Sequence, residues 1–195
     1  PDLGVRSETH ETIVVDLCGV NLAKQMHVGH LRATVIGDAI ARVYEKLGHK
    51  VIRQNHVGDW GLPIAMVAGK LKREADAGRI DLTTLTLDDL DRMYRDAKAE
   101  SSADRKGLAA VERFAAKGIE LGPKIRAELE EQVAGADEEL ALAKDALVRL
   151  QAGDAEIVAV WQRLYDVTMA AFLHTFARLH ANVTAAATAG ATAYC

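Results

Sequence analysis

The sequence predicts an α/β fold in which half of a doubly wound parallel sheet carries a mainly helical extension. Two β-branched apolar runs, at residues 12–18 and 50–55, flank a segment whose apolar side chains recur with helical spacing. A strand, a helix and a strand in this order form a parallel βαβ unit with a right-handed crossover. Hydrophobic residues make up 49% of the chain and charged residues 27%, which is typical of a globular protein.

The βαβ unit is expected to span residues 12–75. Residues 12–18 (TIVVDLC) have the pattern of a buried strand, and residues 50–55 (KVIRQN) that of a second strand. Gly48 lies where a left-handed cap would end the helix between them, and another helix is expected from Pro63 to about Ala75. The first helix is indicated by helical spacing of Leu31, Val35, Ile36, Ala39, Ile40, Val43 and Leu47.

The helical extension is expected to span residues 76–181. Its first part is polar and broken near Ser101. Residues 123–150 carry apolar side chains at alternating intervals of three and four, which predicts a long helix packed on a neighbour in the same chain. A last helix is expected from about Ala155 to Leu179, and residues 182–195 are expected to return to the α/β part with a strand starting at 182–184. Residues 1–11, which lack an initiator methionine, are expected to be a cut edge or linker.

Charge and cysteine content argue against several classes of protein. The net charge of −4 disfavours nucleic-acid binding by bulk electrostatics, because such domains usually carry a basic face. No apolar run approaches the ~20 residues that cross a bilayer, and residues 1–12 do not resemble a signal peptide. The two cysteines, Cys18 and Cys195, do not suggest a disulfide framework. A reducing, cytoplasmic setting without membrane contact is therefore expected.

The chemistry is concentrated in residues 21–30 (Asn-Leu-Ala-Lys-Gln-Met-His-Val-Gly-His), between the first strand and its helix. Parallel sheets bind ligands at such βα loops, and a helix N-terminus offers unpaired N–H groups to phosphate. His27 and His30 face one side of the first helical turn and could donate to phosphate oxygens, while Gly29 leaves room for a nucleotide. Two alternatives stay open. One is half of a metal site, perhaps with Cys18, although no second ligand pair completes it; the other is a turn with incidental histidines.

These residues resemble a known family. Residues 27–30 are similar to the HIGH signature of class I aminoacyl-tRNA synthetases, and their surroundings resemble the version found in arginyl-tRNA synthetases. The resemblance implies the N-terminal half of a catalytic domain, with a Rossmann-like (HUP-type) sheet. The matching segments are residues 21–32, 37–39 and 51–61, with weaker similarity at residues 94–97, 161–169 and 178–179.

The resemblance implies an ATP site formed by His27, Gly29, His30 and Lys24. The two histidines would contact the phosphates and adenosine of ATP and stabilise the transition state of adenylate formation. Gly29 would make space for adenine and ribose, and Lys24 would neutralise phosphate charge. His27, His30 and Lys24 are therefore the candidate catalytic residues, and no protein metal site is expected beside the Mg²⁺ that accompanies ATP.

The resemblance also implies an arginine site. Asn21 would hold the α-amino and carboxylate end of arginine. Asp16 would face the guanidinium, which pairs bidentately with carboxylates. His56, Asp59 and Trp60 follow the second strand at the same edge of the sheet and would wall the pocket. Core packing is the alternative role for Trp60.

The chain departs from the family pattern at three places near the expected site. Residues 18–20 (Cys-Gly-Val) stand where a polar residue and proline are usual, so a looser loop is expected. Residues 62–65 are Leu-Pro-Ile-Ala instead of Thr-Gln-Phe-Gly, and residues 190–194 lack the acidic residue of a Gly-Glu-Ser-x-Tyr pattern. A lysine-rich loop similar to Lys-Met-Ser-Lys-Ser does not occur in the sequence, and neither do later strands or tRNA-binding domains of the family.

The resemblance therefore implies a fragment of an arginine–tRNA ligase. The parent enzyme would activate L-arginine with ATP to arginyl-adenylate and transfer it to tRNA(Arg), and the fragment is expected to be inactive alone. The alternative is a truncated, non-catalytic module that binds ATP or a partner protein. A helical assembly protein is a third hypothesis, weakened because the 123–150 seam is short for a free-standing coiled coil. Self-association is expected through an open edge of the sheet.

Overall fold

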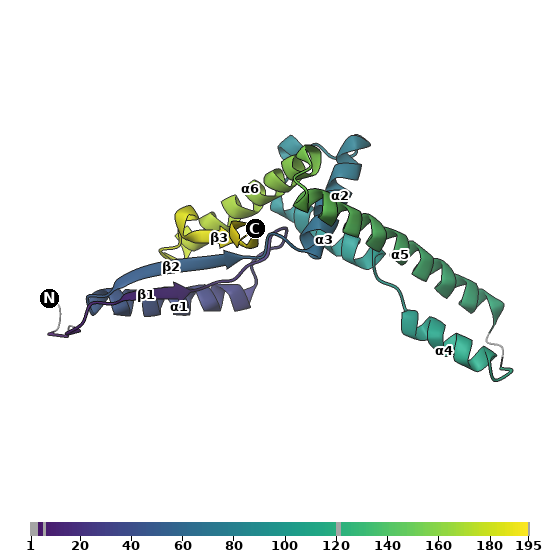
Figure 1. Cartoon of the computed structure of the whole chain (residues 1–195), viewed down its shortest axis with the longest axis horizontal. Coiled ribbons are helices and arrows are strands. Elements are labelled where there is room, and N and C mark those ends of the chain that lie inside the picture. Colours follow the sequence, from purple (N-terminus) through teal and green to yellow (C-terminus); the bar gives the residue numbers. More distant parts are fainter. Residues whose placement is uncertain (1–3, 6, 120–121, 195) are drawn as a thin grey trace.

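A computed structural model describes residues 4, 5, 7–119 and 122–194. Its sheet has three parallel strands in the order β1 (Thr12–Asp16), β2 (Lys50–Val57) and β3 (Thr188–Gly190). The α/β fold predicted from the sequence is confirmed (Figure 1). The helices are α1 (Val28–Lys46), α2 (Leu62–Asp76), α3 (Leu87–Glu100), α4 (Arg105–Ala115), α5 (Pro123–Gln151) and α6 (Ala155–Arg178), with short 3-10 turns η1 (Leu82–Thr84), η2 (Ala185–Ala187) and η3 (Ala191–Tyr194).

The βαβ unit forms as expected, with shifted strand ends. β1 and β2 pair in parallel from Thr12 opposite Lys50 to Asp16 opposite Gln54, and Gly48 adopts φ +94° directly after α1. β1 ends two residues earlier than predicted because the chain turns away at Cys18, whose φ is +74°. β2 runs two residues further than predicted because its end pairs with β3.

The third strand corrects the prediction for the end of the chain. Residues 182–184 form no strand; the strand lies at Thr188–Gly190, where Asn55 pairs with Thr188 and Val57 with Gly190. Thr-Ala-Gly has weak β propensity. The pairing of β3 with β2 therefore depends on α6 and η2, which place residues 188–190 beside β2. One edge of β2 is therefore partly covered. Within the described residues, no strand pairs with the outer edge of β1.

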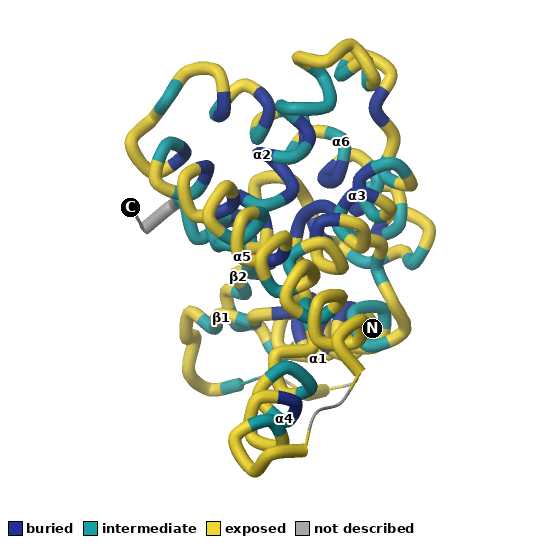
Figure 2. The backbone as a smooth tube through the Cα atoms, turned by 90° about the vertical axis from the view of Figure 1, so that its right-hand side faces the viewer, coloured by how far each residue is buried: buried dark blue, intermediate teal, exposed yellow. Residues whose placement is uncertain are grey.

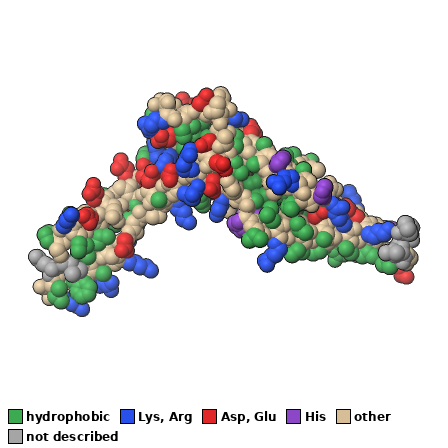
Figure 3. All heavy atoms as spheres, turned by 180° about the vertical axis from the view of Figure 1, so that it is seen from behind, with side chains coloured by type: hydrophobic (Ala, Val, Ile, Leu, Met, Phe, Trp, Pro, Cys, Tyr) green, Lys and Arg blue, Asp and Glu red, His purple; other side chains and the backbone are tan. Residues whose placement is uncertain are grey.

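The apolar stripe of α1 faces away from the sheet. Its buried residues are instead Thr34, Gly37, Asp38 and Ala41, and a Cβ at Gly37 would lie 2.5 Å from the Cβ of Leu17. Close approach to β1 therefore requires small side chains, and the larger ones point outward. Hydrophobic side chains consequently gather on the surface of the arm that carries α1 and the sheet (Figure 3). The exposed apolar residues of α1 include Val28, Val35, Ile36, Ile40 and Val43.

The face of the sheet opposite α1 is also open. Arg53 points towards α1, where it meets Asp38, and side chains alternate along a strand. The paired residues Val14 and Ile52 therefore point to the other face, where they are 61% and 41% exposed. A doubly wound sheet carries helices on both faces, whereas among the residues that the structure describes α1 covers one face and no helix covers Val14 and Ile52 on the other. Exposed apolar surfaces of this kind usually mark interfaces.

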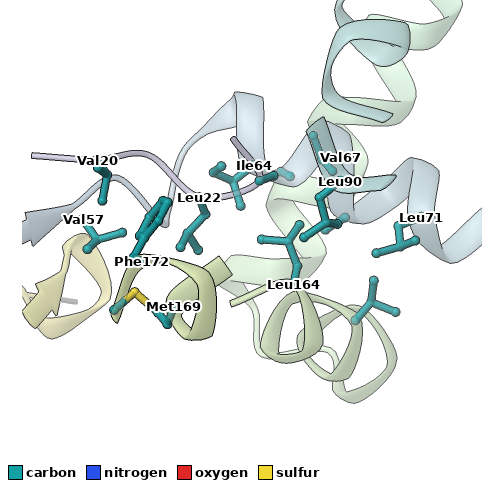
Figure 4. Packing of buried hydrophobic residues seen from close by; sticks show 14 of the residues in the cluster. Val20, Leu22, Val57, Ile64, Val67, Leu71, Leu90, Leu164, Met169 and Phe172 are labelled. Carbon is teal, nitrogen blue, oxygen red and sulfur yellow. The ribbon is translucent and has the colours of Figure 1, made fainter. Parts of the chain in front are cut away.

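The main hydrophobic core lies beyond the carboxyl ends of the strands. Buried segments concentrate where α2, α3 and α6 meet (Figure 2). Side chains from the loop after β1, such as Leu22, pack there against Phe172 of α6, and Leu90 of α3 joins the same cluster (Figure 4). The helical extension and the ends of β1 and β2 thus share one core.

The long helix α5 packs on α2, as predicted for residues 123–150. A Cβ at Gly69 of α2 would lie 2.9 Å from the Cβ of Ala146, so the two helices approach closely where both residues are small. Ala136, Ala143 and Leu150 of the predicted seam are buried. The far part of α5 runs beside α4 and projects from the body of the molecule (Figure 1). None of the helices in the described residues is both long and apolar enough to span a bilayer.

A buried ion-pair network joins α1, β2 and the chain after α6. The Nε of Arg53 donates to Oδ1 of Asp38 at 2.9 Å, and its other guanidinium nitrogens contact both carboxylate oxygens of Glu45. Asp38 also accepts from Arg42 at 2.6 Å and from the backbone N–H of Asn182 at 3.2 Å. The side chains of Arg53 and Asp38 are each 7% exposed. The network therefore fixes where the chain turns towards β3.

Candidate functional site

The candidate site begins where the loops after β1 and β2 run side by side. Asn21 forms an isolated parallel bridge with Gly58, supported by hydrogen bonds from Leu22 N to Gly58 O (3.2 Å) and from Gly58 N to Val20 O (2.9 Å). A Cβ at Gly58 would lie 2.1 Å from Oδ1 of Asn21. The position after β2 therefore needs a glycine so that the Asn21 side chain can lie against it.

Two helices of the extension fix the loop between β1 and α1. Ala23 is buried with φ +57°, and its backbone N–H donates to Oγ1 of Thr168 in α6 at 3.2 Å. Gln25 donates to Oδ1 of Asp88, in the first turn of α3, at 2.6 Å. The loop conformation therefore depends on residues far away in the sequence.

His27 and His30 form a capping box at the N-terminus of α1. His27 is the N-cap, and its Nδ1 accepts the backbone N–H of Gly29 at 3.1 Å. Nδ1 of His30 accepts the backbone N–H of His27 at 3.2 Å. The two rings stack with centroids 3.8 Å apart and an interplanar angle of 28°. As predicted from their spacing, both imidazoles lie on one side of the first helical turn.

Positive charge surrounds the histidine pair. Burial, followed by the nearby charges of His27 and Lys24, holds the pKa of His30 below its usual value of 6.5. A neutral His30 is therefore favoured near neutral pH. The ammonium group of Lys24 lies 5.8 Å from the centroid of the Tyr94 ring in α3, within the distance at which cations and aromatic rings attract.

A cavity of about 260 Å³ lies next to this loop. Trp60 lines it and makes an edge-to-face contact with Trp161 of α6 at 5.6 Å. Trp60 therefore lines the cavity and also packs against α6, while its predicted place in an arginine site stays a prediction. Within the described part of the chain, no charged residue lines this cavity; the lining residues are Asn21, Gly58, Trp60, Gly61, Pro63, Ile64, Tyr94 and Ala191.

The carboxylates predicted for arginine binding lie outside the lining of this cavity. Asp16 is exposed at the end of β1. Asp59 is fully buried and accepts from Thr192, from Oγ1 at 2.7 Å and from N at 3.3 Å, while its backbone oxygen accepts from Nε1 of Trp161 at 2.9 Å. His56 lies in β2 opposite Ala189. The structure thus brings Asn21 and Trp60 to one cavity and gives Asp59 partners near the end of the described chain.

Several lining residues were not singled out as site residues from the sequence. Tyr94 belongs to a segment of weaker family similarity, which was its only signal. Pro63, Ile64 and Ala191 are positions where the chain departs from the family pattern, and all three line the cavity. Within the described part of the chain, no group of three or more His, Cys, Asp or Glu side chains is arranged to hold a metal ion.

The parallel sheet, the βα loop and the paired histidines at a helix N-terminus define the catalytic domain of a class I aminoacyl-tRNA synthetase. The family described as "tRNA synthetases class I (R), catalytic domain" matches residues 2–194. The chain belongs to the arginyl-tRNA synthetase family.

Similar proteins agree with this assignment. The arginine–tRNA ligase of Haemophilus influenzae (strain PittEE) is 37% identical over 183 residues, which cover 94% of this chain and 26% of that protein. The ligase of Photorhabdus laumondii is 38% identical over 192 residues, covering 98% of this chain and 27% of the relative. The chain thus spans about a quarter of the length of these relatives.

Two solved structures share the fold. Arginyl-tRNA synthetase from Plasmodium falciparum superimposes with a TM-score of 0.60 and 25% identity, over 96% of this chain and 25% of that one. The Thermus thermophilus arginyl-tRNA synthetase superimposes with a TM-score of 0.51 and 22% identity, over 85% and 22% of the two chains. The second likeness concerns the fold alone.

Proposed function

We propose that this chain contributes the N-terminal half of the catalytic site of an arginine–tRNA ligase. In the complete site, a carboxylate oxygen of L-arginine attacks the α-phosphorus of ATP, the bond to pyrophosphate breaks, and arginyl-adenylate forms, with Mg²⁺ bound to the ATP phosphates. Transfer to tRNA(Arg) follows, in the cytoplasm. The observation that carries this proposal is the histidine pair at the N-terminus of α1, in a chain of this family whose preceding loop lines a cavity with Asn21.

The residues at the start of α1 would bind ATP. His27 and His30 would donate to phosphate oxygens as negative charge develops in the transition state. Lys24, held near Tyr94, would neutralise phosphate charge, and Gly29 would admit the nucleotide. This assignment rests on the proximity of the four groups and on the unpaired N–H groups of a helix N-terminus.

The cavity would receive arginine, with Asn21 at its α-amino and carboxylate end and Trp60 as a wall. Asp16, His56 and Asp59 remain proposed arginine-site residues, with Asp59 acting through Thr192. A guanidinium group is normally bound by a carboxylate in a bidentate pair, and the lining of this cavity carries none. We therefore expect the isolated chain to bind L-arginine weakly.

Restoring a carboxylate tests the assignment of the cavity. Ala191→Glu places an acidic side chain in the lining, at the position where the family pattern has one. The variant should bind L-arginine up to about 5-fold more tightly, corresponding to about 1 kcal/mol at most for a partly exposed ion pair. Ala186→Glu is the matched control, because Ala186 is exposed in the preceding segment and outside the lining. Equal arginine affinity of the two variants would refute the cavity as the guanidinium site.

ATP binding tests the histidine pair. Isothermal titration with ATP and magnesium should give weak binding to the chain and weaker binding to His30→Ala, because the helix N-terminus supplies only part of a nucleotide site. Equal binding by both proteins would refute the contact. The chain alone should not arginylate tRNA, since a missing charged donor typically costs ~10²–10³ in rate. An activity near that of a complete ligase would show that the missing residues are dispensable.

The second candidate function is a non-catalytic module that binds a partner protein. The open apolar surfaces of α1 and of the sheet favour it. A module of this kind would keep its partner when His27 and His30 are both replaced, whereas a ligase fragment would lose nucleotide binding.

A further inference from the structure

The two hydrogen bonds of the capping box determine where each imidazole proton lies. The backbone N–H groups of Gly29 and His27 can only donate. The nitrogens that face them, Nδ1 of His27 and Nδ1 of His30, must therefore be acceptors and carry no proton. In a neutral imidazole the single proton then lies on the other nitrogen. Both neutral rings must carry their proton on Nε2.

We propose that the N-terminus of α1 is a tautomer lock that places the single proton of each neutral imidazole, His27 and His30, on Nε2, with Gly29 as its positioning residue. The lock is built from the chain itself. No ligand is needed to form it, since both acceptor atoms are already engaged by the backbone. Within the described residues, no hydrogen bond uses Nε2 of either ring, so both Nε2–H groups remain available as donors.

Gly29 is required because the His27 ring occupies the place of its side chain. A Cβ at position 29 would lie 2.8 Å from Cε1 and 3.0 Å from Nδ1 of His27, closer than carbon atoms normally approach. The ring could then no longer fold back over the N–H of residue 29. The space left by the missing side chain is used by the imidazole itself, which gives this glycine a role before any nucleotide arrives.

The lock would affect how the two histidines bind an anionic ligand. This consequence rests on the proposed function. Two neutral stacked rings offer two N–H donors without a net charge, so phosphate oxygens can be bound without protonating either imidazole. Protonation would place a proton on Nδ1, opposite a backbone N–H, and break the cap. The positive charge at the site would then come from Lys24, and the histidines would supply directed hydrogen bonds.

His10 is expected to have the opposite tautomer, with its proton on Nδ1. Nδ1 of His10 lies 2.7 Å from the carbonyl oxygen of Gly48, which can only accept. His10 must therefore carry its proton on Nδ1 while this contact exists. It serves as an internal reference, because a general preference of free imidazole for Nε2–H would give all three residues the same tautomer.

Nitrogen-15 NMR of the histidine rings in the intact 195-residue chain tests the lock without any ligand. At about pH 8, well above the ordinary imidazole pKa of about 6.5, cross-peak patterns should show Nε2–H for His27 and His30 and Nδ1–H for His10. Scalar coupling across the N–H···N hydrogen bonds should connect Gly29 N with His27 Nδ1, and His27 N with His30 Nδ1. Absence of both couplings, or an Nδ1–H tautomer at either residue, would overturn the proposal.

Two variants separate the lock from general stability. Gly29→Ala should abolish the coupling to His27 and speed amide exchange at residue 29 by tenfold or more. Gly135→Ala is the control, because Gly135 lies within α5 and a Cβ there meets nothing within 4 Å. It should leave both couplings in place. A Gly29→Ala protein that retains the coupling would show that Gly29 does not position the ring.

Anion binding, which rests on the proposed function, is tested separately from the lock. Inorganic pyrophosphate, added to the wild-type chain and to His27→Asn, reports on the donors. Asparagine can cap the helix with its side-chain oxygen but lacks the Nε2–H group. A locked pair predicts that pyrophosphate shifts the Nε2 resonances of the wild type, and that the variant keeps the cap and binds at least threefold more weakly. Equal binding would overturn the role of the Nε2–H donors, while the couplings in the free chain would still decide the lock.

Discussion

Removing Asp38 should destabilise the chain strongly, because it breaks the buried network that joins α1 to β2. Asp38→Ala leaves the Arg53 side chain, 7% exposed, with Glu45 as its remaining carboxylate, and deprives the N–H of Asn182 of its acceptor. Breaking a buried ion pair by removing one partner costs about 3–5 kcal/mol. Because Glu45 remains, we expect a loss of about 3 kcal/mol in the free energy of unfolding.

Urea unfolding followed by circular dichroism measures this loss. Arg92→Ala is the control: Arg92 pairs with Asp89 on the exposed side of α3, where such pairs contribute about 0.2–1 kcal/mol. The double variant Asp38→Leu, Arg53→Met should be more stable than Asp38→Ala, because it leaves no buried guanidinium with a missing partner. An unfolding free energy of Asp38→Ala within about 1 kcal/mol of the wild-type value would refute this prediction. So would a double variant that is less stable than both the wild type and Asp38→Ala.

Three further predictions follow from the structure. Gly58→Ala should cost about 1–3 kcal/mol, because its Cβ would meet Oδ1 of Asn21; thermal unfolding that matches the wild type would contradict this. The chain should self-associate in sedimentation velocity over a concentration series, and Val14→Lys should reduce the part of this association that uses the open sheet face. A clean wild-type monomer with residues 12–16 as protected from amide exchange as α5 would refute association through either the face or the edge of the sheet. Because burial and the charges of His27 and Lys24 lower the pKa of His30, its folded value lies below the unfolded one. The unfolding free energy should therefore fall as pH drops below 6.5, and His30→Asn should flatten this dependence between pH 6.5 and the lowered pKa.

The sequence predicted the parts of the fold whose signals are local. β1, α1 and β2 appear where periodicity and the cap at Gly48 placed them, and α5 was expected at 123–150 and lies at Pro123–Gln151. Helical spacing identified α1 but not the direction of its stripe. The apolar side chains face outward because a close approach to β1 requires small residues such as Gly37. The spacing of apolar residues predicts that a helix forms, but it does not predict which neighbour the helix packs against.

β3 and the cavity could not be predicted, because both depend on distant segments. Residues 188–190 are a strand only because α6, η2 and the hydrogen bond from Asn182 to Asp38 deliver them beside β2. Tyr94 reaches the cavity because Leu90 of α3 is buried in the shared core. The contact between Gly29 and the His27 ring is local, yet it depends on a rotamer that residue types alone do not specify.

The two halves of the candidate site consequently differ in what holds them. The histidine pair is fixed by hydrogen bonds between residues at most three apart, which form together with the first turn of α1. The cavity requires α3, the loop after β2 and residue Ala191 to meet, and Thr192, the neighbour of Ala191, is held by its hydrogen bond to Asp59. Loss of sheet contacts should therefore disturb the cavity before the histidine pair. In a chain with an open sheet face, the group that would bind phosphate is the more robust, because its geometry needs only one helix end.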